Sequence, residues 1–416
     1  MDHSNVLIMT LVSCLVMAFL FGLVAQRLKF SPIVGYLLAG VICGPFTPGF
    51  IADVGLALEM AEVGVVLLMF GVGMRFSPRE LMEVKGLAIP GALVQIAAAT
   101  SMGYALGIWS GFTQIESFLF GLSLSVASTV VLLRTLENRR QLKSEGGRIA
   151  VGWLIVEDMM MVFALVLLPA LIEAGGKEHG ISDILIALAF TLGKIALFIG
   201  LMMIVGSRIL PALLIRIAQE KSRELFTLGT LAIALGMAYA ASEWFGASLA
   251  LGAFLAGLIL SNSEISQRAT EKSLPLRDIF AVLFFVSVGM LFNPMIILNA
   301  PLQVLGVVLT IMVGKSLMAL LIVLLFRHPL ETGLTIAASL AQIGEFSFIL
   351  AGFGLKAGLL SEQANCLILA GALISIALNP FFFRFADWLG PKLRMSSWLN
   401  TRLMRLERLP PVSTGL

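Results

Sequence analysis

Charge is scarce in this sequence. Asp, Glu, Lys and Arg make up 13% of its 416 residues, about half the share of a typical soluble protein, while 59% of the residues are hydrophobic. This composition, with a mean hydropathy of +1.00, is typical of a helical protein that crosses the lipid bilayer many times. It excludes a water-soluble fold and leaves three classes, namely a transporter, a channel or an intramembrane enzyme.

Cysteine and histidine are also rare. The three cysteines lie in apolar stretches and form neither a disulfide framework nor a metal-ligand spacing. The histidines, His3, His179 and His328, lie in flanks or loops, which excludes an intramembrane metalloprotease site. No glycine-rich phosphate loop precedes a Lys-Ser or Lys-Thr pair, so ATP-driven transport within this chain is excluded too. We expect no cofactor, and a net charge of +3 gives no support for a nucleic-acid partner.

Apolar stretches of spanning length fill the chain. Cutting it at charged or Pro/Gly-rich breaks predicts an all-α polytopic membrane protein with about thirteen transmembrane helices. The predicted spans are 5–26, 31–45, 56–74, 87–109, 115–134, 148–172, 182–207, 225–243, 247–261, 277–297, 301–326, 331–353 and 362–388. No basic segment precedes the first stretch and no cleavage site follows it, so it is interpreted as a retained span rather than a signal peptide.

The basic residues between the spans predict the orientation. Of the 28 Lys and Arg residues, 24 fall on one side of the predicted membrane, two on the other and two inside spans. Cytoplasmic loops retain basic residues, so we expect the N-terminus outside and the C-terminus in the cytoplasm. That arrangement requires an odd number of spans, in agreement with the segment count.

An internal repeat links the two halves of the chain. Matching segments, about 216 residues apart, are Val66–Met74 with Val282–Met290, Gly35 and Leu38–Gly40 with Gly252 and Leu255–Gly257, and Ser123-Leu124 with Ser339-Leu340. They pair span three with ten, two with nine and five with twelve. A shift of seven spans reverses the direction of crossing, so the two copies are predicted to be inverted.

Two adjacent acids lie halfway along the sixth predicted span. Glu157 and Asp158 are about 100° apart on a helix, so both side chains can reach the edge of one cavity. Desolvated carboxylates this close repel each other when both are charged, which favours a proton or cation at one of them. The alternative is a structural ion pair or a buried neutral acid.

Two lysines lie at the middle of spans. Lys315 is in span eleven and Lys194 in span seven. Either ammonium can pair with the acids, and Lys315 is the better candidate because its span belongs to the repeat copy that faces span six. For Lys194, contact with a lipid headgroup or a backbone carbonyl is an equal alternative.

Polar residues beside a glycine predict helix breaks at mid-membrane. In span twelve they are Gln342 and Glu345, and in the matching span five they are Ser125, Ser128 and Thr129. Unwound backbone at this depth is tolerated where it lines a cavity, so both spans are predicted to be broken helices whose ends meet. For the small residues of span five alone, ordinary helix packing is the alternative.

These motifs together resemble a known family. The segments that carry the resemblance are Ser31–Gly40, Leu67–Phe70, Val156–Asp158, Leu283–Met290, Gly314-Lys315 and Ala341–Phe346. The chain resembles, over essentially its whole length, the Kef-type branch of the monovalent cation:proton antiporter superfamily and most closely its YbaL-type group. The resemblance implies a sodium/proton-antiporter-like fold with two crossed broken helices, in a homodimer in the bacterial inner membrane.

The resemblance also implies a division into domains. It predicts a scaffold and dimer domain from 1–76 and 224–297, a core transport domain from 86–172 and 300–388, a linker helix at 181–208 and a basic cytoplasmic tail at 389–416. The core is expected to move like an elevator between the two faces of the membrane. The family commonly carries a cytosolic nucleotide-binding regulatory domain, and the tail looks like the start of a linker to such a domain, for which this chain has no room.

For the site, the resemblance implies that Asp158 is the essential ligand for the cation and the proton. Glu157 lies beside it and can pair with Lys315, and both acids would bind the monovalent cation transiently. The expected function is exchange of K⁺ or Na⁺ for H⁺. Kef-type proteins usually have glutamine where this chain has Glu157, so ion preference and stoichiometry stay open. The alternative function is a ligand-gated, channel-like potassium efflux pathway controlled by the absent regulatory domain.

Overall fold

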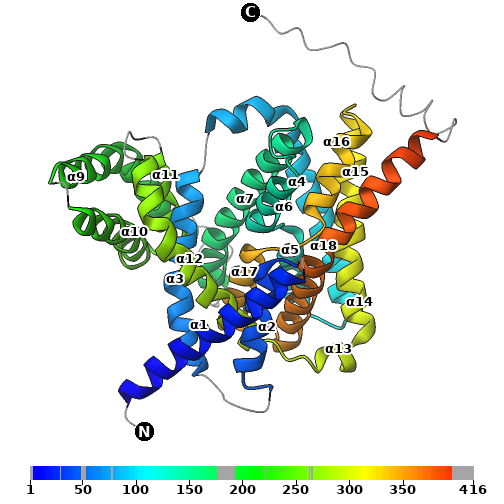
Figure 1. The fold of residues 1–416 in the computed structure, drawn as a ribbon, viewed down its shortest axis with the longest axis horizontal. Coiled ribbons are helices and arrows are strands. Elements are labelled where there is room, and N and C mark those ends of the chain that lie inside the picture. Colours follow the sequence, from blue (N-terminus) through cyan, green and yellow to red (C-terminus); the bar gives the residue numbers. More distant parts are fainter. Residues whose placement is uncertain are drawn as a thin grey trace, which may run out of the picture. The chain divides into compact units, whose positions relative to one another are not determined.

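The described structure consists of helices grouped in two compact units. It is a computed structural model that describes residues 3–28, 30–47, 53–75, 78–175, 193–220, 222–261, 263 and 266–395. Unit 1 contains residues 1–20, 36–78 and 159–290, and unit 2 contains residues 21–35, 79–158 and 291–416 (Figure 1). The first part of the predicted linker helix, 181–192, and the tail from 396 onward lie outside the described residues.

Unit 1 is built from most of α1 and α2, from α3, from the later part of α7 and from α9 to α12, while the end of α1 and the start of α2 belong to unit 2. Their bounds are α1 His3–Arg27, α2 Pro32–Cys43, α3 Val54–Arg75, α7 Glu145–Gly175, η1 Met202–Gly206, α9 Ser207–Gln219, α10 Arg223–Phe245, α11 Leu249–Ser261 and α12 Ser266–Met290. The π-helical turn η1 and α9 are parts of one continuous helical stretch, Gly193–Gln219. Helix α3 packs against both α11 and α12.

Glycines set the closest helix contacts in unit 1. A Cβ added at Gly40, Gly73, Gly257 or Gly289 would lie 2.0–2.1 Å from a backbone oxygen of the neighbouring helix, so these positions accept no side chain. Gly40 and Gly289 join α2 to α12, and Gly73 and Gly257 join α3 to α11. In the predicted repeat Gly40 matches Gly257 and Gly73 matches Gly289. Since α2 corresponds to α11 and α3 corresponds to α12, the α2–α12 contact and the α3–α11 contact are equivalent under the repeat. This equivalence supports the repeat.

Unit 2 contains the predicted broken spans. Its helices are α4 Pro78–Trp109, α5 Gln114–Ser125, α6 Thr129–Asn138, α7 as far as Asp158, α13 Ile296–Asn299, α14 Pro301–Leu309, η2 Thr310–Gly314, α15 Lys315–Leu325, α16 Leu330–Leu340, α17 Glu345–Lys356 and α18 Glu362–Met395. Helices α15 and α16 pack side by side, as do α5 and α17, and α18 contacts α14, α16 and α17.

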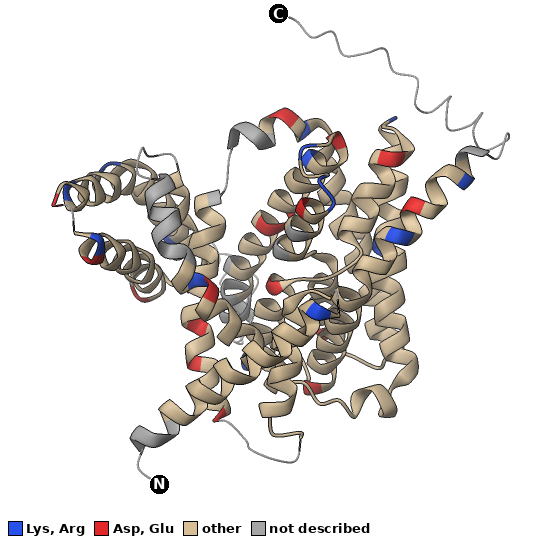
Figure 2. Cartoon of the chain, viewed as in Figure 1, with Lys and Arg blue, Asp and Glu red and all other residues tan. Residues whose placement is uncertain are grey.

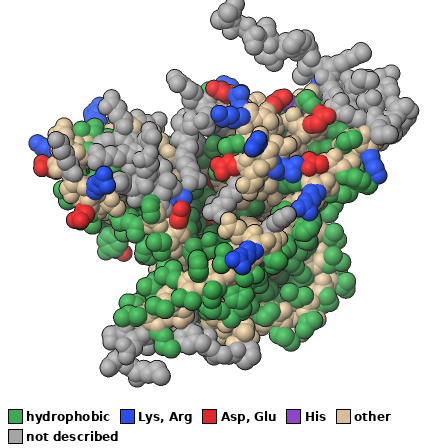
Figure 3. All heavy atoms as spheres, viewed as in Figure 1, with side chains coloured by type: hydrophobic (Ala, Val, Ile, Leu, Met, Phe, Trp, Pro, Cys, Tyr) green, Lys and Arg blue, Asp and Glu red, His purple; other side chains and the backbone are tan. Residues whose placement is uncertain are grey.

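The apolar surface is that of a multi-pass membrane protein. Eight helices in the described part are long and apolar enough to cross a membrane, and α2 and α11 are shorter apolar helices. In unit 2, α14 carries no charged residue, and Figure 2 shows many of the charged residues near helix ends. Large hydrophobic side chains are exposed along α14 and α15, and Figure 3 shows green surface over this part of the unit. The number of thirteen membrane spans stays a prediction.

Several predicted helix ends were wrong. The loop expected after residue 207 is helical through Gln219, and α12 begins at Ser266 rather than near residue 277. Helix α4 begins at Pro78, nine positions before the predicted start. Charged residues were taken to end a span, but an arginine or lysine can extend its side chain to water while its backbone stays helical.

Helix ends repeat between the two halves of unit 2. Helix α4 is followed by Gly111 with φ +87°, and α15, 216 residues later, is followed by Arg327 with φ +65°. At both ends the N–H of the left-handed residue bonds to a carbonyl three residues back, and the next N–H bonds to one five residues back. Helices α6 and α17 end in the same way, with Arg140 and Gly358 in the left-handed conformation.

Gly111→Ala is expected to lower the free energy of unfolding by about 1 kcal/mol, because a Cβ disfavours the left-handed conformation. The matched control is Gly86→Ala in α4, since both glycines have nothing within 4 Å of an added Cβ. The control should be neutral or stabilising by about 0.5–1 kcal/mol, as alanine favours a helix interior. Thermal unfolding in detergent measures both, and equal shifts of the two midpoints would contradict the prediction.

Candidate functional site

Two nonhelical segments meet inside unit 2. Helix α5 ends at Ser125 and α6 begins at Thr129, while α16 ends at Leu340 and α17 begins at Glu345. The intervening segments, 126–128 and 341–344, touch, since a Cβ added at Gly344 would lie 2.4 Å from Cα of Ser128. All of these intervening residues with a side chain are buried. The chain therefore leaves the helical conformation twice at one buried place.

One side chain pairs the two segments. The backbone N–H of Ser128 donates to Oε1 of Gln342 at 3.0 Å, and Nε2 of Gln342 donates to the carbonyl oxygen of Ser128 at 3.1 Å. Both peptide groups of Ser128 are thus satisfied by a single amide. Gln342 is fully buried, so no water replaces it from the surface. This pairing fixes the segment between α5 and α6 against the segment between α16 and α17.

The last carbonyls of α16 each have a partner. The four acceptors are Ala337, bonded by the Ser316 hydroxyl at 2.9 Å; Ala338, bonded by the Asn379 amide at 2.9 Å; Ser339, bonded by the Gln342 amide at 3.4 Å; and Leu340, bonded by the Gln342 N–H at 2.8 Å. A helix end leaves these groups without helical partners, and inside a membrane each unpaired group is costly. The break is therefore a satisfied, specific conformation.

The two predicted acids lie at the N-terminal end of α6. Oε2 of Glu157 accepts the N–H of Ala127 at 2.8 Å, and Oδ2 of Asp158 accepts the Thr129 hydroxyl at 2.8 Å. Glu157 is fully buried and Asp158 is 4% exposed. Among the described residues, Oε1 of Glu157 and Oδ1 of Asp158 accept no hydrogen bond. Each carboxylate is thus held through one oxygen, and its other oxygen is available to a ligand.

A third acid reaches the same helix end. Oε2 of Glu345 accepts the Ser128 hydroxyl at 2.9 Å, and Ser128 Oγ in turn accepts the N–H of Val131 as the N-cap of α6. Glu345 is buried and is the first residue of α17. The N-terminus of a helix carries partial positive charge, which favours anionic groups beside it. The positive end of α6 is therefore surrounded by Glu157, Asp158 and Glu345.

Lys315 is buried at the same break, but in a different contact from the predicted one. Its Nζ donates to the carbonyl oxygen of Gln342 at 3.1 Å, and within the described residues no ion pair joins it to Glu157 within 4.0 Å. The direct pair was expected from the repeat copy that contains Lys315 and from the family resemblance, and neither indicates which acceptor lies nearest. The carbonyls released beyond α16 carry partial negative charge and compete for the ammonium. Lys315 and Glu157 still interact electrostatically.

Two other candidates have different surroundings. The Ser125 hydroxyl donates to Leu122 within its own helix at 2.7 Å, so Ser125 takes part in the break through its carbonyl rather than its side chain. That carbonyl accepts Nε2 of Gln95 at 3.1 Å. Lys194 belongs to unit 1, and its side chain is exposed.

Sequence reasoning missed three neutral polar residues beside the site, namely Gln95, Asn379 and Ser316. Gln95 is fully buried, and its Oε1 accepts Nε1 of Trp153 at 3.5 Å. Asn379 and Ser316 hold the end of α16, as described above. In the sequence Gln95 is one amide inside an otherwise apolar run, whereas Gln342 stood out because a glycine and a carboxylate lie close beside it.

Comparison with known proteins assigns the family. The transmembrane sodium/hydrogen exchanger family matches residues 15–386. The chain belongs to this family. Its relatives are transporters rather than enzymes, and the predicted resemblance to the cation:proton antiporters and their Kef-type branch is confirmed.

Among similar proteins, the "Putative cation/proton antiporter YbaL" of Escherichia coli (strain K12) is 56% identical over 390 residues, 93% of this chain and 70% of that protein. K(+) efflux antiporter 4 of Arabidopsis thaliana is 31% identical over 354 residues, 85% of this chain and 59% of that protein. The solved sodium proton antiporter MjNhaP1 from Methanocaldococcus jannaschii at pH 8 shares the fold, with a TM-score of 0.69 at 17% identity and coverage of 91% and 97%.

Gly344→Ala is expected to lower the free energy of unfolding by about 1–3 kcal/mol, because the new Cβ collides with the backbone of Ser128 and separates the two segments. The control is Gly352→Ala in α17, which has open space around its position and should not destabilise the protein. Thermal midpoints of the purified variants measure the difference. Identical midpoints would show that the segments do not pack as described.

Proposed function

We propose that this protein exchanges a monovalent cation, K⁺ or Na⁺, for H⁺ across the membrane at Asp158 and Glu157. The observation that supports this most is the pair of adjacent buried carboxylates, each held through one oxygen at the break between α5 and α6. A desolvated carboxylate needs a positive partner. Oxygen atoms of carboxylates and hydroxyls are the ligands that hard cations prefer. A site that takes a proton or a cation, but not both, couples the two movements.

In this proposal unit 2 is the moving core and unit 1 the scaffold. Residues 79–158 and 291–416 of unit 2 contain every member of the predicted site, including both nonhelical segments. We interpret the segments as a crossed pair of broken helices. An elevator movement carries the site from one face of the membrane to the other, in a homodimer of the bacterial inner membrane with the N-terminus outside and the C-terminus in the cytoplasm. A cytosolic regulatory domain is a further proposed partner.

Lys315 balances the charge of the site when no cation is present. Its ammonium is held at the carbonyl of Gln342, within electrostatic reach of Glu157. A cation that arrives at the acids replaces this interaction with a closer one. Since one positive partner substitutes for another, the buried acids are not left without compensation in either state. Sodium and potassium carry the same charge and differ in size and ligand number, so the two acids do not determine which ion is the substrate. The transport assay described next identifies it.

Asp158→Asn is expected to abolish exchange and leave the protein folded, because the amide keeps a partner for Thr129 but binds neither a proton nor a cation at neutral pH. The measurement uses purified protein in liposomes with an internal pH dye, an imposed proton gradient, and Na⁺, K⁺, Li⁺ and Rb⁺ added in turn. Glu83→Gln, at an exposed acid of the same unit, is the control and should exchange normally. Normal exchange by Asp158→Asn would refute the site.

Glu157→Gln is expected to retain exchange and to change its dependence on membrane voltage. The substitution removes a buried charge that faces Lys315, while Asp158 still binds the ions. Exchange currents recorded at a series of imposed potentials compare the variant with the wild type. The same current–voltage relation in both would argue against a charged role for Glu157.

The alternative function is a gated, channel-like efflux pathway that uses the same acids as a filter. The chain spans 59% of K(+) efflux antiporter 4, so a control region outside this sequence is compatible with the comparison. The liposome assay separates the two functions. Proton movement that follows one cation supports the antiporter, whereas cation flux without proton movement supports the efflux pathway.

A further inference from the structure

Helix α6 connects the site to an ion pair at its other end. Its first residue, Thr129, holds Asp158, and the residue after its last is Arg139. The helix has ten residues, so at a rise of 1.5 Å per residue it is a rod of roughly 15 Å. A displacement of the Arg139 end along the helix axis therefore moves the hydroxyls of Ser128 and Thr129 relative to the acids.

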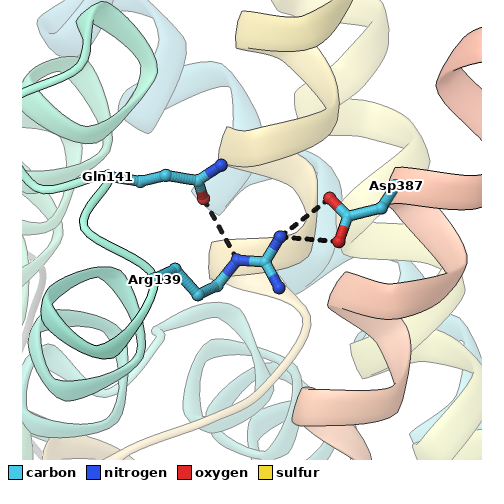
Figure 4. Close-up of polar contacts among 3 residues, drawn as sticks. All are labelled: Arg139, Gln141 and Asp387. Carbon is cyan, nitrogen blue, oxygen red and sulfur yellow. Dashed lines mark hydrogen bonds and ion pairs between the residues drawn. The ribbon is translucent and has the colours of Figure 1, made fainter.

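Arg139 has three contacts, of which Figure 4 shows those with Asp387 and Gln141. Its Nη2 donates to both carboxylate oxygens of Asp387 in α18, at 2.8 and 2.7 Å, and its Nε donates to Oε1 of Gln141 at 3.1 Å. The guanidinium carbon lies 4.9 Å from the centre of the Phe383 ring, also in α18. A planar guanidinium with separate donors can make these contacts together, which an ammonium does not reproduce.

The turn after α6 prearranges this geometry. Arg140 has φ +56°, and the N–H of Gln141 bonds back to the carbonyl of Leu136 at 2.8 Å. The chain therefore reverses direction directly after Arg139. This reversal places the Gln141 amide beside Nε of Arg139, so the side chain is held by its own loop as well as by α18.

In the described part of this unit, a second ion pair also joins two helical regions, but its arginine is more exposed than Arg139. The Arg139 side chain is 25% exposed and that of Asp387 is 57% exposed, and Phe383, whose ring lies under the guanidinium, is buried. In the pair of Arg148 with Glu83, which joins α7 to α4, the side chains are 54% and 55% exposed. Exposed pairs contribute little to folding. The second pair is thus a matched control that also joins two helices but does not hold the short helix of the site.

We propose that Arg139 and Asp387 are positioning residues for cation binding: their pair fixes α6 against α18 and thereby sets where Ser128 and Thr129 meet the acids. Neither residue touches the cation. This inference rests on the proposed exchange function. It adds that Asp387 of α18 influences the geometry of the site through α6.

The test measures the apparent KM for the cation and the maximal exchange rate in liposomes of the full chain. Arg139→Ala and Asp387→Ala should each raise the KM about fivefold, the factor that corresponds to loss of an ion pair of about 1 kcal/mol. Arg148→Ala and Glu83→Ala should leave the KM at the wild-type value. The double variant with Arg139→Asp and Asp387→Arg should move the KM back toward the wild type.

Thermal midpoints of the same variants show whether the protein stays folded, and Arg139→Ala should unfold only slightly below Arg148→Ala. An unchanged KM in either Arg139→Ala or Asp387→Ala would overturn the inference, as would a midpoint shift far beyond that of the controls. A wild-type protein that moves no protons when cations are added would instead refute the proposed function. The two failures are therefore distinguishable.

Discussion

The structure around the site depends on pairing the backbone N–H and C=O groups that lose their helical hydrogen bonds inside the membrane. Each unpaired N–H or C=O at that depth costs several kcal/mol, so a helix can stop there only where side chains replace the missing bonds. Here the replacements come from distant parts of the chain: Gln342 pairs both groups of Ser128, Gln95 reaches the end of α5, and Lys315 reaches the carbonyl of Gln342. The helices that contribute these side chains are held together by the same bonds.

In each of the two acids, one carboxylate oxygen accepts a hydrogen bond at the helix break, and the other is proposed to bind the proton or cation. Glu157 satisfies the N–H of Ala127 with one oxygen, and Asp158 receives the hydroxyl of Thr129 with one oxygen. The second oxygen of each has no hydrogen bond within the described part of the chain. A proton or cation that binds and leaves at the second oxygen does not disturb the bond at the first. The broken backbone can therefore persist through both loaded states of the site.

The sequence predicts the charged part of this arrangement better than the neutral part. Glu157, Asp158 and Glu345 stand out because a carboxylate inside an apolar run is costly, and the repeat indicates which two spans to compare. The all-helical membrane fold follows from composition, and the family comparison supports it. Gln95 could not be found in this way, because one amide among apolar residues has no distinctive pattern. The hydrogen bond of Lys315 to the carbonyl of Gln342 could not be predicted, because position along a span gives depth but not which acceptor lies nearest.

The repeat explains why two helix breaks exist. The two copies differ in their charged residues, and this difference explains why the breaks form one site rather than two. Gln95 and Lys315 do the same structural work in the two copies, since each donates to a carbonyl beside a break. One is neutral and the other charged. The paired acids of α7 lie in the first copy, and the ammonium lies in the second. Inverted copies with equal charges would place two equivalent sites in the core. With acids in one copy and the lysine in the other, the two copies bring opposite charges to one place. In the proposed exchange, the repeated backbone would supply the two related conformations that alternating access requires.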